Sequence, residues 1–242
     1  MTSLPSALIV CDALDVTWPA ASKSFVPGFT IREGKGGGQR VSAATTIGSV
    51  DNSQIGPAEN AMRALGQTPL FMVRPGDDLL ETHLEELEYV KKDTTLLYAI
   101  PTTEIAATKP PPITSFQVWP PLAAQREVWA EGGTHAARLA VMNRADCPKT
   151  TFLGRVNDRP AASAFAGVAH DCTMLHSLEV ARTDRCQGLA ANLTRACAIW
   201  GQTQGAKWFT LAAVEANIAA NALYTSLGMQ VVGQYHYRIK PD

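Results

Sequence analysis

Apolar and polar residues alternate along the second half of the chain in patterns that predict strands and helices in turn. Residues 175–180 (LHSLEV) alternate with a period of two, which is typical of a half-buried strand. After a short polar turn, Leu193, Cys197 and Trp200 recur at helical spacing. A further apolar helical pattern ends at Gly228, because glycine readily adopts the left-handed conformation that follows a helix.

The same reading assigns most of the remaining chain to short helices and strands. Predicted helices cover residues 12–24, 58–65, 77–87, 122–131 and 134–143. Predicted strands cover residues 29–32, 40–45, 70–73, 94–100, 116–119, 150–156 and 161–169. Helices and strands are thus interspersed along the chain, which predicts an α/β fold.

A glycine-rich run at residues 34–38 (GKGGG) admits two interpretations. One is a phosphate-binding loop, and the other is the tip of a hairpin between two strands. No Lys-Ser/Thr pair follows the run, and a strand is predicted where a phosphate loop would lead into a helix. We therefore expect a hairpin tip.

Two segments share an order of elements that predicts an internal duplication. Residues 61–100 and 197–239 both read helix, strand, helix, strand, with Gly-Gln-Thr beginning at Gly66 and at Gly201. Between them, Pro110-Pro111-Pro112 cannot continue a helix or strand and predicts a domain boundary. The predicted domains are residues 1–108 and 113–242.

Composition and charge restrict the class of protein. The 242-residue chain has a formal net charge of −1 and no apolar run of membrane-spanning length. We expect neither a nucleic-acid nor a membrane partner. The first residues make a poor signal peptide, and the five cysteines are scattered, so we expect reduced thiols in a cytoplasmic protein. Oligomeric state cannot be read from the sequence.

The turn after residues 175–180 has the features of an anion site. The first N–H groups of a helix lack internal partners, and the helix dipole adds positive potential there. Gly188 would let a phosphate approach the backbone, and Arg185 adds a fixed positive charge. By itself this R-x-x-G-x-A pattern, which ends at Ala190, is a weak signal.

A second motif follows in the sequence NIAANALYTSLG, which begins at Asn217 and ends at Gly228. On a helix, Asn217 and Tyr224 are two turns apart and share a face. The two motifs in this order resemble the GNAT superfamily of acyl-CoA-dependent N-acetyltransferases, over residues 114–240. The resemblance implies a mixed-sheet α/β (α+β) GNAT fold. Together with the duplication, it implies two tandem copies of which the N-terminal one is degenerate.

The resemblance also implies roles for individual residues. A pyrophosphate of acetyl-CoA would bind the backbone of the turn, and the pantetheine arm would pair with a strand splayed from its neighbour. The implied cofactor-binding residues are Leu178, Val180, Arg185, Gln187, Gly188, Leu189, Ala190, Asn217 and Tyr224. The sequence departs from the family at Cys186, where glycine is common, and at Arg182, where proline is common.

Two residues are candidates for catalysis. The phenol of Tyr224 would protonate the leaving thiolate, and the alternative is a core tyrosine with its hydroxyl at the surface. His176 would act as general base, since an imidazole titrates near neutrality and a period of two places His176 on the face of Leu178 and Val180. A half-buried structural histidine is the alternative. His170 and Cys172 lack a second pair with ligand spacing, so we predict no metal.

The sequence thus predicts an N-acetyltransferase that transfers the acetyl group of acetyl-CoA to a primary amine by direct attack in a ternary complex. The acceptor would be a small amine or a peptide, and no cluster of charges in the sequence identifies it. Two alternatives stay open: a non-catalytic acyl-CoA-binding sensor, and a dinucleotide-binding oxidoreductase. The absence of G-x-G-x-x-G disfavours the oxidoreductase.

Overall fold

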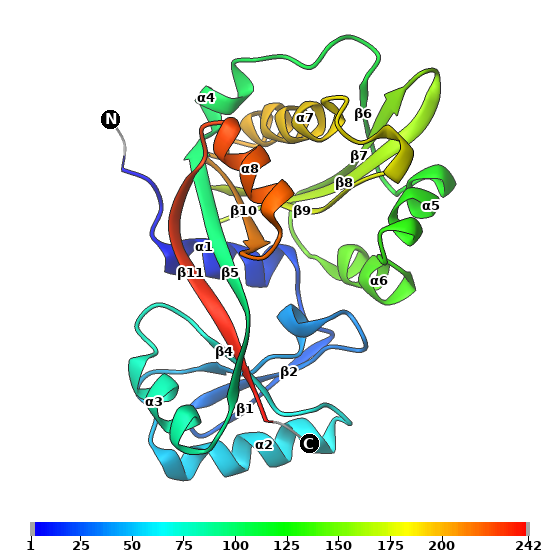
Figure 1. Cartoon of the computed structure of the whole chain (residues 1–242). Helices are drawn as coiled ribbons and strands as arrows, with labels where there is room; N and C mark the ends of the chain where they lie inside the picture. The colour runs from blue at the N-terminus through cyan, green and yellow to red at the C-terminus, as the bar shows by residue number, and fades with distance from the viewer. Residues whose placement is uncertain (1–2, 241–242) are drawn as a thin grey trace.

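The computed structural model describes residues 3–240 as a mixed α/β protein (Figure 1). The elements of residues 3–108 are α1 (Ala7–Thr17), β1 (Ser22–Val26), β2 (Phe29–Glu33), β3 (Thr45–Thr46), α2 (Ile55–Ala64), β4 (Leu70–Val73), α3 (Asp78–Glu86), β5 (Val90–Pro101) and α4 (Thr102–Ala106). Those that follow are β6 (Ser115–Val118), α5 (Ala123–Glu131), α6 (Ala136–Arg144), β7 (Lys149–Val156), β8 (Arg159–Ala169), β9 (Cys172–Val180), α7 (Leu189–Thr203), β10 (Trp208–Val214), α8 (Ile218–Ser226) and β11 (Gln230–Ile239).

One eight-stranded sheet runs through both predicted domains. Its strand order is β4-β11-β5-β10-β9-β8-β7-β6, and β1, β2 and β3 form a separate three-stranded sheet. The pair β9 and β10 is parallel, whereas the other neighbours in the large sheet are antiparallel. The predicted mixed-sheet fold is therefore confirmed.

The two long central strands, β5 and β11, each pair with strands of the other predicted domain. β5 belongs to the first half in sequence but pairs with β10, and β11 belongs to the second half but also pairs with β4. β5 and β11 pair with each other along most of their length and cross from the upper to the lower part of the molecule (Figure 1). The sheet therefore crosses the sequence boundary predicted at residues 108–113.

Pairings on either side of β5 and β11 match each other. β4 lies antiparallel to β11, as β10 lies antiparallel to β5. On its other side, β4 meets Ala44 in a parallel bridge at Phe71, and β10 meets β9 in parallel. The order of neighbours is thus the same in both directions from the centre of the sheet.

Helices cover both faces of the upper part of the sheet. Met174 packs in the hydrophobic cluster of α1 and α6, whereas the next residue, Leu175, packs in the cluster of α7. Successive strand residues point to opposite faces, so α1 and α7 lie on opposite sides of β9. A third cluster packs α2 and α3 against β2 and β4 in the lower part. No helix among residues 3–240 has the length and apolar character that crossing a bilayer requires.

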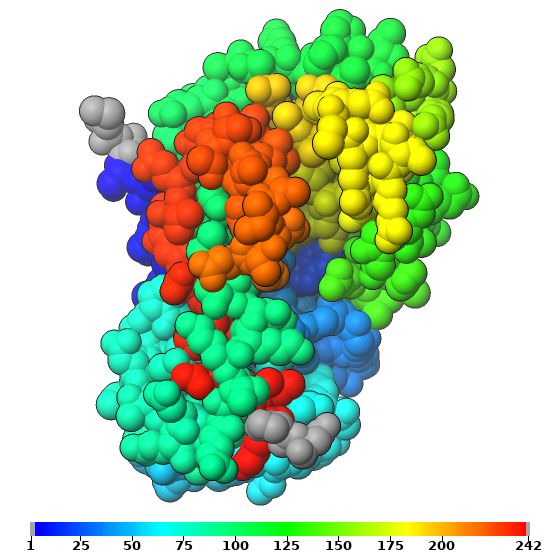
Figure 2. All heavy atoms as spheres, in the orientation of Figure 1, coloured from blue at the N-terminus to red at the C-terminus, as the bar shows by residue number. Residues whose placement is uncertain are grey.

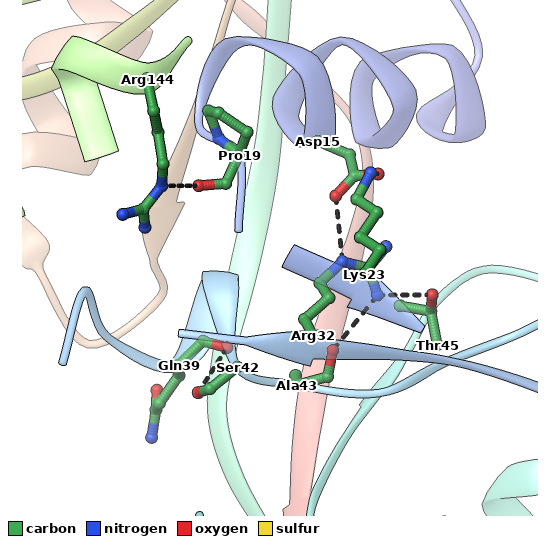
Figure 3. A network of polar contacts seen from close by, with 9 residues as sticks. All are labelled: Asp15, Pro19, Lys23, Arg32, Gln39, Ser42, Ala43, Thr45 and Arg144. Carbon is green, nitrogen blue, oxygen red and sulfur yellow. Dashed lines mark hydrogen bonds and ion pairs between the residues drawn. The ribbon is translucent and has the colours of Figure 1, made fainter. Parts of the chain in front are cut away.

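Polar contacts join α1 and the segment that follows it to both halves of the chain (Figure 3). Asp15 of α1 accepts hydrogen bonds from Arg32 Nε of β2 at 3.0 Å and from Lys23 Nζ of β1 at 2.5 Å. At the other end of this region, Arg144 Nε of α6 donates to the carbonyl of Pro19 at 2.9 Å (Figure 3). The segment after α1 is thereby held between the two halves.

The first predicted helix begins and ends earlier than expected. α1 covers Ala7–Thr17, with Ser6 as its N-cap, whereas residues 12–24 were predicted. Pro19 disfavours helical geometry at the residue before it, and Trp18 accordingly leaves the helix at φ −135° and ψ 68°. The short apolar run before Asp12 is the first part of this helix.

Residues 34–38 are not a hairpin tip. The hairpin is formed by β1 and β2, and the glycine run follows β2 and leads into a 3-10 turn at Gln39–Val41. Gly37 packs against the side chains of Val41 and Val141, so the run serves close packing.

The Gly-Gln-Thr tripeptides at Gly66 and Gly201 are not equivalent in the structure. Gly66 follows α2 at φ +70°, and the glycine that follows α7 in the same conformation is Gly205 at φ +81°. Gly201 lies inside α7 against Thr173, where a Cβ would have no room. The tripeptide match was therefore a coincidence, although the order of elements around it agrees.

Candidate active site

A groove opens where β9 and β10 separate. The two strands pair only from Cys172 and Trp208 to Leu175 and Leu211. Beyond this point a cavity of about 350 Å³ is lined by residues of both strands, including Leu178 and residues 212–214. Figure 2 shows the surface hollowed below the orange residues of α8, with blue N-terminal residues at the bottom of the hollow.

A β-bulge at Ser177 marks the place where the strands part. Ser177 has φ +47°, and the register of β9 against β8 shifts next to it. Its carbonyl turns toward α5 and accepts a hydrogen bond from Trp129 Nε1 at 2.7 Å. A bulge adds one residue to a strand and therefore changes which face the following residues occupy.

Because of the bulge, His176 and Leu178 lie on opposite faces of the sheet. His176 packs with Trp18 and Phe165 on the side of α1, whereas Leu178 and Val180 pack with the cluster of α7. The prediction that these three residues share a face was wrong, because the bulge interrupts the period of two.

Tyr224 and Asn217 both line the groove from α8. Tyr224 is largely buried, and its ring lies 5.8 Å from that of Tyr98 between centroids. Burial raises the pKa of the Tyr224 phenol well above its ordinary value, so the phenol keeps its proton at neutral pH. Asn217 is the N-cap of α8, and its side-chain oxygen accepts from the backbone of Ala220 at 3.2 Å.

The predicted anion-binding turn leads into α7. Gly188 is the N-cap at φ +79°, no side chain caps the helix, and a Cβ at Gly188 would meet nothing within 4 Å. Gln187 and Gly188 are exposed, Leu189 is buried and Ala190 is half-buried. The first N–H groups of α7 are therefore accessible from outside, as an anion site requires.

Arg185 reaches back from this turn to the end of β9. Its guanidinium donates to the carbonyl of Val180 at 3.2 Å and forms an ion pair with Glu179 at 3.0 Å. The neighbouring Cys186 has φ +61°, a conformation that glycine adopts at lower cost. The glycine that is common at this position in GNAT proteins thus has a conformational reason.

His176 lies in an apolar environment at the edge of the groove. Its ring stacks on Trp18 at 5.0 Å, and its Nε2 is 2.8 Å from Thr17 Oγ1. The Thr17 hydroxyl donates to the carbonyl of Ala13, so Nε2 carries the proton and donates to Thr17. Nδ1 is then an unprotonated acceptor, and it is buried without a partner among the described residues.

Burial and, to a lesser degree, the positive charge of Arg40 lower the pKa of His176 well below its ordinary value. The titration near neutrality that we expected from the sequence is therefore shifted to more acidic pH. The physical reason is that the charged imidazolium would lose its hydration among aromatic rings.

The sequence model described as the acetyltransferase (GNAT) family matches residues 116–229 of this chain. The matched segment runs from β6 to the end of α8 and includes the bulged strand, the turn before α7 and Tyr224. The chain contains a GNAT-family domain. None of the curated proteins matches the sequence.

Solved structures share the fold along almost the whole chain, beyond the matched GNAT domain. A GCN5-related N-acetyltransferase from Kribbella flavida has a TM-score of 0.75 at 16% identity, covering 98% of this chain and 96% of its own. A conserved protein of unknown function from Staphylococcus epidermidis has a TM-score of 0.67 at 12% identity, covering 93% and 96%. A tandem GNAT protein from the clavulanic acid biosynthesis pathway has a TM-score of 0.61 at 12% identity, covering 96% and 88%.

Residues outside the GNAT domain also line the groove, and sequence reasoning did not find them. Trp18, Arg40 and Asp93 reach it from the first half, and Tyr235 and Tyr237 reach it from β11. The glycine run before Arg40 was the local sequence signal for this part of the groove, and we interpreted it as the tip of a hairpin. No three His, Cys, Asp or Glu side chains gather as a metal-binding group among residues 3–240.

Proposed function

We propose that the protein is an acetyl-CoA-dependent N-acetyltransferase that acts on a primary amine. The observation that carries the proposal is the groove between β9 and β10. It has a protonated phenol at Tyr224 on one side, and an accessible helix N-terminus follows β9. The GNAT domain, matched from β6 to α8, contains all of these parts.

The residues of the chain suit acetyl-CoA as the acyl donor. The free N–H groups at Gly188, Leu189 and Ala190 would hold the pyrophosphate, with Arg185 and Gln187 beside it. The strand edge at Leu178 and Val180 would pair with the pantetheine arm, because β10 does not pair with it there. Asn217 would contact the same arm from α8.

Tyr224 is proposed as the general acid. The amine nitrogen attacks the thioester carbonyl carbon, the new C–N bond forms, and the C–S bond breaks. The phenol of Tyr224 gives its proton to the departing thiolate, and the proton lost by the amine leaves through the groove to water. The phenol is protonated at neutral pH, so this proton is available when the thiolate, a stronger base than water, develops.

His176 stays a predicted catalytic residue whose task would fall to Nδ1. Its lowered pKa makes it a weak proton acceptor at neutral pH, so its contribution would be to accept a hydrogen bond that orients the amine. His176→Ala would be tested by the ratio of mutant to wild-type turnover against pH. A general base predicts that the ratio rises with pH, and an orienting role predicts a constant ratio.

Residues 1–108 are proposed to be a degenerate copy of the domain at 113–242. The matched pairings around β4 and β10 support this, as do the ends of α3 and α8, where Glu88 and Gly228 follow the helices at φ +60° and +82°. This alignment puts Leu84 at the place of Tyr224, because their carbonyls accept from Tyr89 and Met229 respectively. The degenerate copy therefore lacks the phenol.

Thiol release from acetyl-CoA in the presence of an amine panel tests the proposed function. Saturable binding of CoA together with amine-dependent thiol release is the expected result. Binding of CoA without release for any amine, amino acid or peptide would favour the acyl-CoA-binding sensor. Binding of NAD in place of CoA would favour the oxidoreductase.

A further inference from the structure

A loop and a helix that lie far apart in sequence both line the groove. A Cβ at Gly37 would lie 2.7 Å from Val141 Cγ2 of α6, so only glycine permits this approach. A Cβ at Gly38 would lie 3.7 Å from Arg138 Nη2 of the same helix. Arg138 therefore lies beside Gly38, two residues before Arg40, and both arginines line the groove.

Arg40 lies where β9 and β10 part. Its Nε donates to Tyr235 Oη at 3.1 Å, and its Nη2 donates to the carbonyl of Ala212 at 3.4 Å. Ala212 follows Leu211, the last residue of β10 that pairs with β9. The guanidinium is therefore half-buried and held in place by two neutral oxygens, with donors left for a further partner.

Neither Arg40 nor Arg138 forms an ion pair with a carboxylate of the described residues. The groove has one carboxylate, Asp93, and its side chain is at the exposed rim. Arg138 is exposed and stays hydrated, whereas the half-buried guanidinium of Arg40 has only two neutral hydrogen-bond partners in place of the hydration that it loses. Such a group is stabilised by an anionic ligand, and the planar guanidinium matches the two oxygens of a carboxylate or phosphate.

The pyrophosphate of CoA is not this ligand. Its proposed site lies at residues 185–190, and none of these residues is among those that line the groove. Arg40 and Arg138 instead share the groove with Tyr224, the residue proposed to act at the thioester. The two arginines are thus placed to bind the acceptor substrate and not CoA.

We propose that the acceptor carries, besides its amine, a carboxylate or phosphate group that binds Arg40 and Arg138. This inference rests on the proposed acetyltransferase function and adds the chemical class of its substrate. The acceptor class is thus an amino acid, an amino-terminal or side-chain amine near a carboxylate, or an amine phosphate.

Matched pairs of amines test the proposal with the full-length protein. β-Alanine is compared with propylamine, and O-phosphoethanolamine with ethanolamine, at constant ionic strength and saturating acetyl-CoA. Within at least one pair, we expect kcat/KM from thiol release to favour the anionic member by about tenfold or more. The two pairs distinguish a carboxylate from a phosphate site.

Variants then assign this preference to the arginines. Arg40→Gln and Arg138→Gln should each lower the ratio of kcat/KM between the anionic and the neutral amine, and the double variant should bring it close to one. Arg126→Gln is the matched control, because Arg126 is an exposed arginine on α5 that does not line the groove. It should leave the ratio unchanged.

A binding measurement separates this inference from the proposed function. With CoA bound, glutarate or inorganic phosphate should bind to the wild-type protein and more weakly to Arg40→Gln, as followed by titration of amide signals. Two results would overturn this inference alone, provided that CoA binds and amines react. One is an equal kcat/KM for the neutral and the anionic amine of each pair. The other is an Arg40→Gln variant with an unchanged kcat/KM ratio and unchanged anion binding. If CoA itself does not bind, both proposals fail.

Discussion

Gly188 has a left-handed backbone at φ +79°, which glycine adopts at no cost. The space on the side where a Cβ would stand is open, so a phosphate can approach the backbone there. Aspartate tolerates this conformation, but its carboxylate would stand beside the proposed phosphate. We expect Gly188→Asp to weaken CoA binding at least tenfold, about 1.4 kcal/mol, in calorimetry.

Gly205 at the other end of α7 supplies the matched control for Gly188. It has φ +81°, and a Cβ there would also meet nothing within 4 Å. Gly205→Asp therefore introduces the same residue in the same conformation, away from the turn. Equal CoA affinity of the two variants would show that the pyrophosphate does not bind at Gly188.

Tyr224→Phe keeps the buried ring and removes the proton donor. Turnover should fall about 100-fold, as expected for loss of a general acid, while CoA affinity and stability change little. Tyr98→Phe is the control, because its ring neighbours Tyr224 and its hydroxyl donates to Asn221 at 3.2 Å. Unchanged turnover in Tyr224→Phe, with chemistry rate-limiting, would assign Tyr224 to packing.

His176 should make the fold sensitive to mild acid. The pKa of His176 is lowered in the folded state. Below its unfolded-state pKa of about 6.5, the unfolded chain therefore binds a proton that the native state does not bind. Stability that is fully present above this pH is therefore lost as the pH falls, by up to about 1.4 kcal/mol per pH unit. Denaturant unfolding at pH 7, 6 and 5 should show this slope, and His176→Gln should reduce it. An identical slope in both proteins would contradict the effect of burial.

At the scale of elements, the exchange of β5 and β11 decides which fragments can fold. A fragment that begins at Pro112 lacks β5, which lies between β10 and β11 at the centre of the sheet. In this fragment, β10 and β11 each have an unpaired edge, and the core residues that pack against Leu97 of β5 are exposed. We therefore expect the fragment to aggregate or to show no cooperative unfolding. A fragment that begins at Leu87 retains β5.

Comparing these two fragments tests the exchange directly. Both fragments lack α1, which covers one face of β8 and β9, but the fragment that begins at Leu87 should show the more cooperative thermal unfolding by circular dichroism and measurable CoA binding, because every strand from β10 to β6 keeps its partners. The fragment that begins at Pro112 should keep neither. Equal behaviour of both fragments would show that β5 is dispensable for the GNAT domain.

For the whole molecule, we expect one CoA per chain. The N-terminal half offers no equivalent turn, because the Asp51 side chain already accepts from the backbone of Ser53 at 2.8 Å, and Gln54 completes a capping box. A carboxylate at this helix start repels phosphate, and Pro57 lacks an N–H group in the first turn of α2. Calorimetric titration should give a stoichiometry of one. Two equivalent sites would contradict a degenerate first half.

Local patterns in the sequence determined many of the elements and the family. Residues 70–73 form β4 as predicted, and the glycine-stopped helix before Gly228 is α8. The GNAT resemblance and the mixed α/β fold are confirmed, because both depend on short-range signals: periodicity, a turn glycine and a helix stop. Helix ends were less accurate, as at α1, because capping competes with propensity over a single turn.

Only the tertiary structure decided which residues share the site. The bulge at Ser177 changes the face of every later residue of β9, and the sequence shows no sign of it. The exchange of β5 and β11 depends on pairing between segments more than a hundred residues apart, which local propensity does not encode. Arg40 and Arg138 line the same groove because Gly37 packs on Val141, and this contact, not any cluster in the sequence, gives the groove its positive charge.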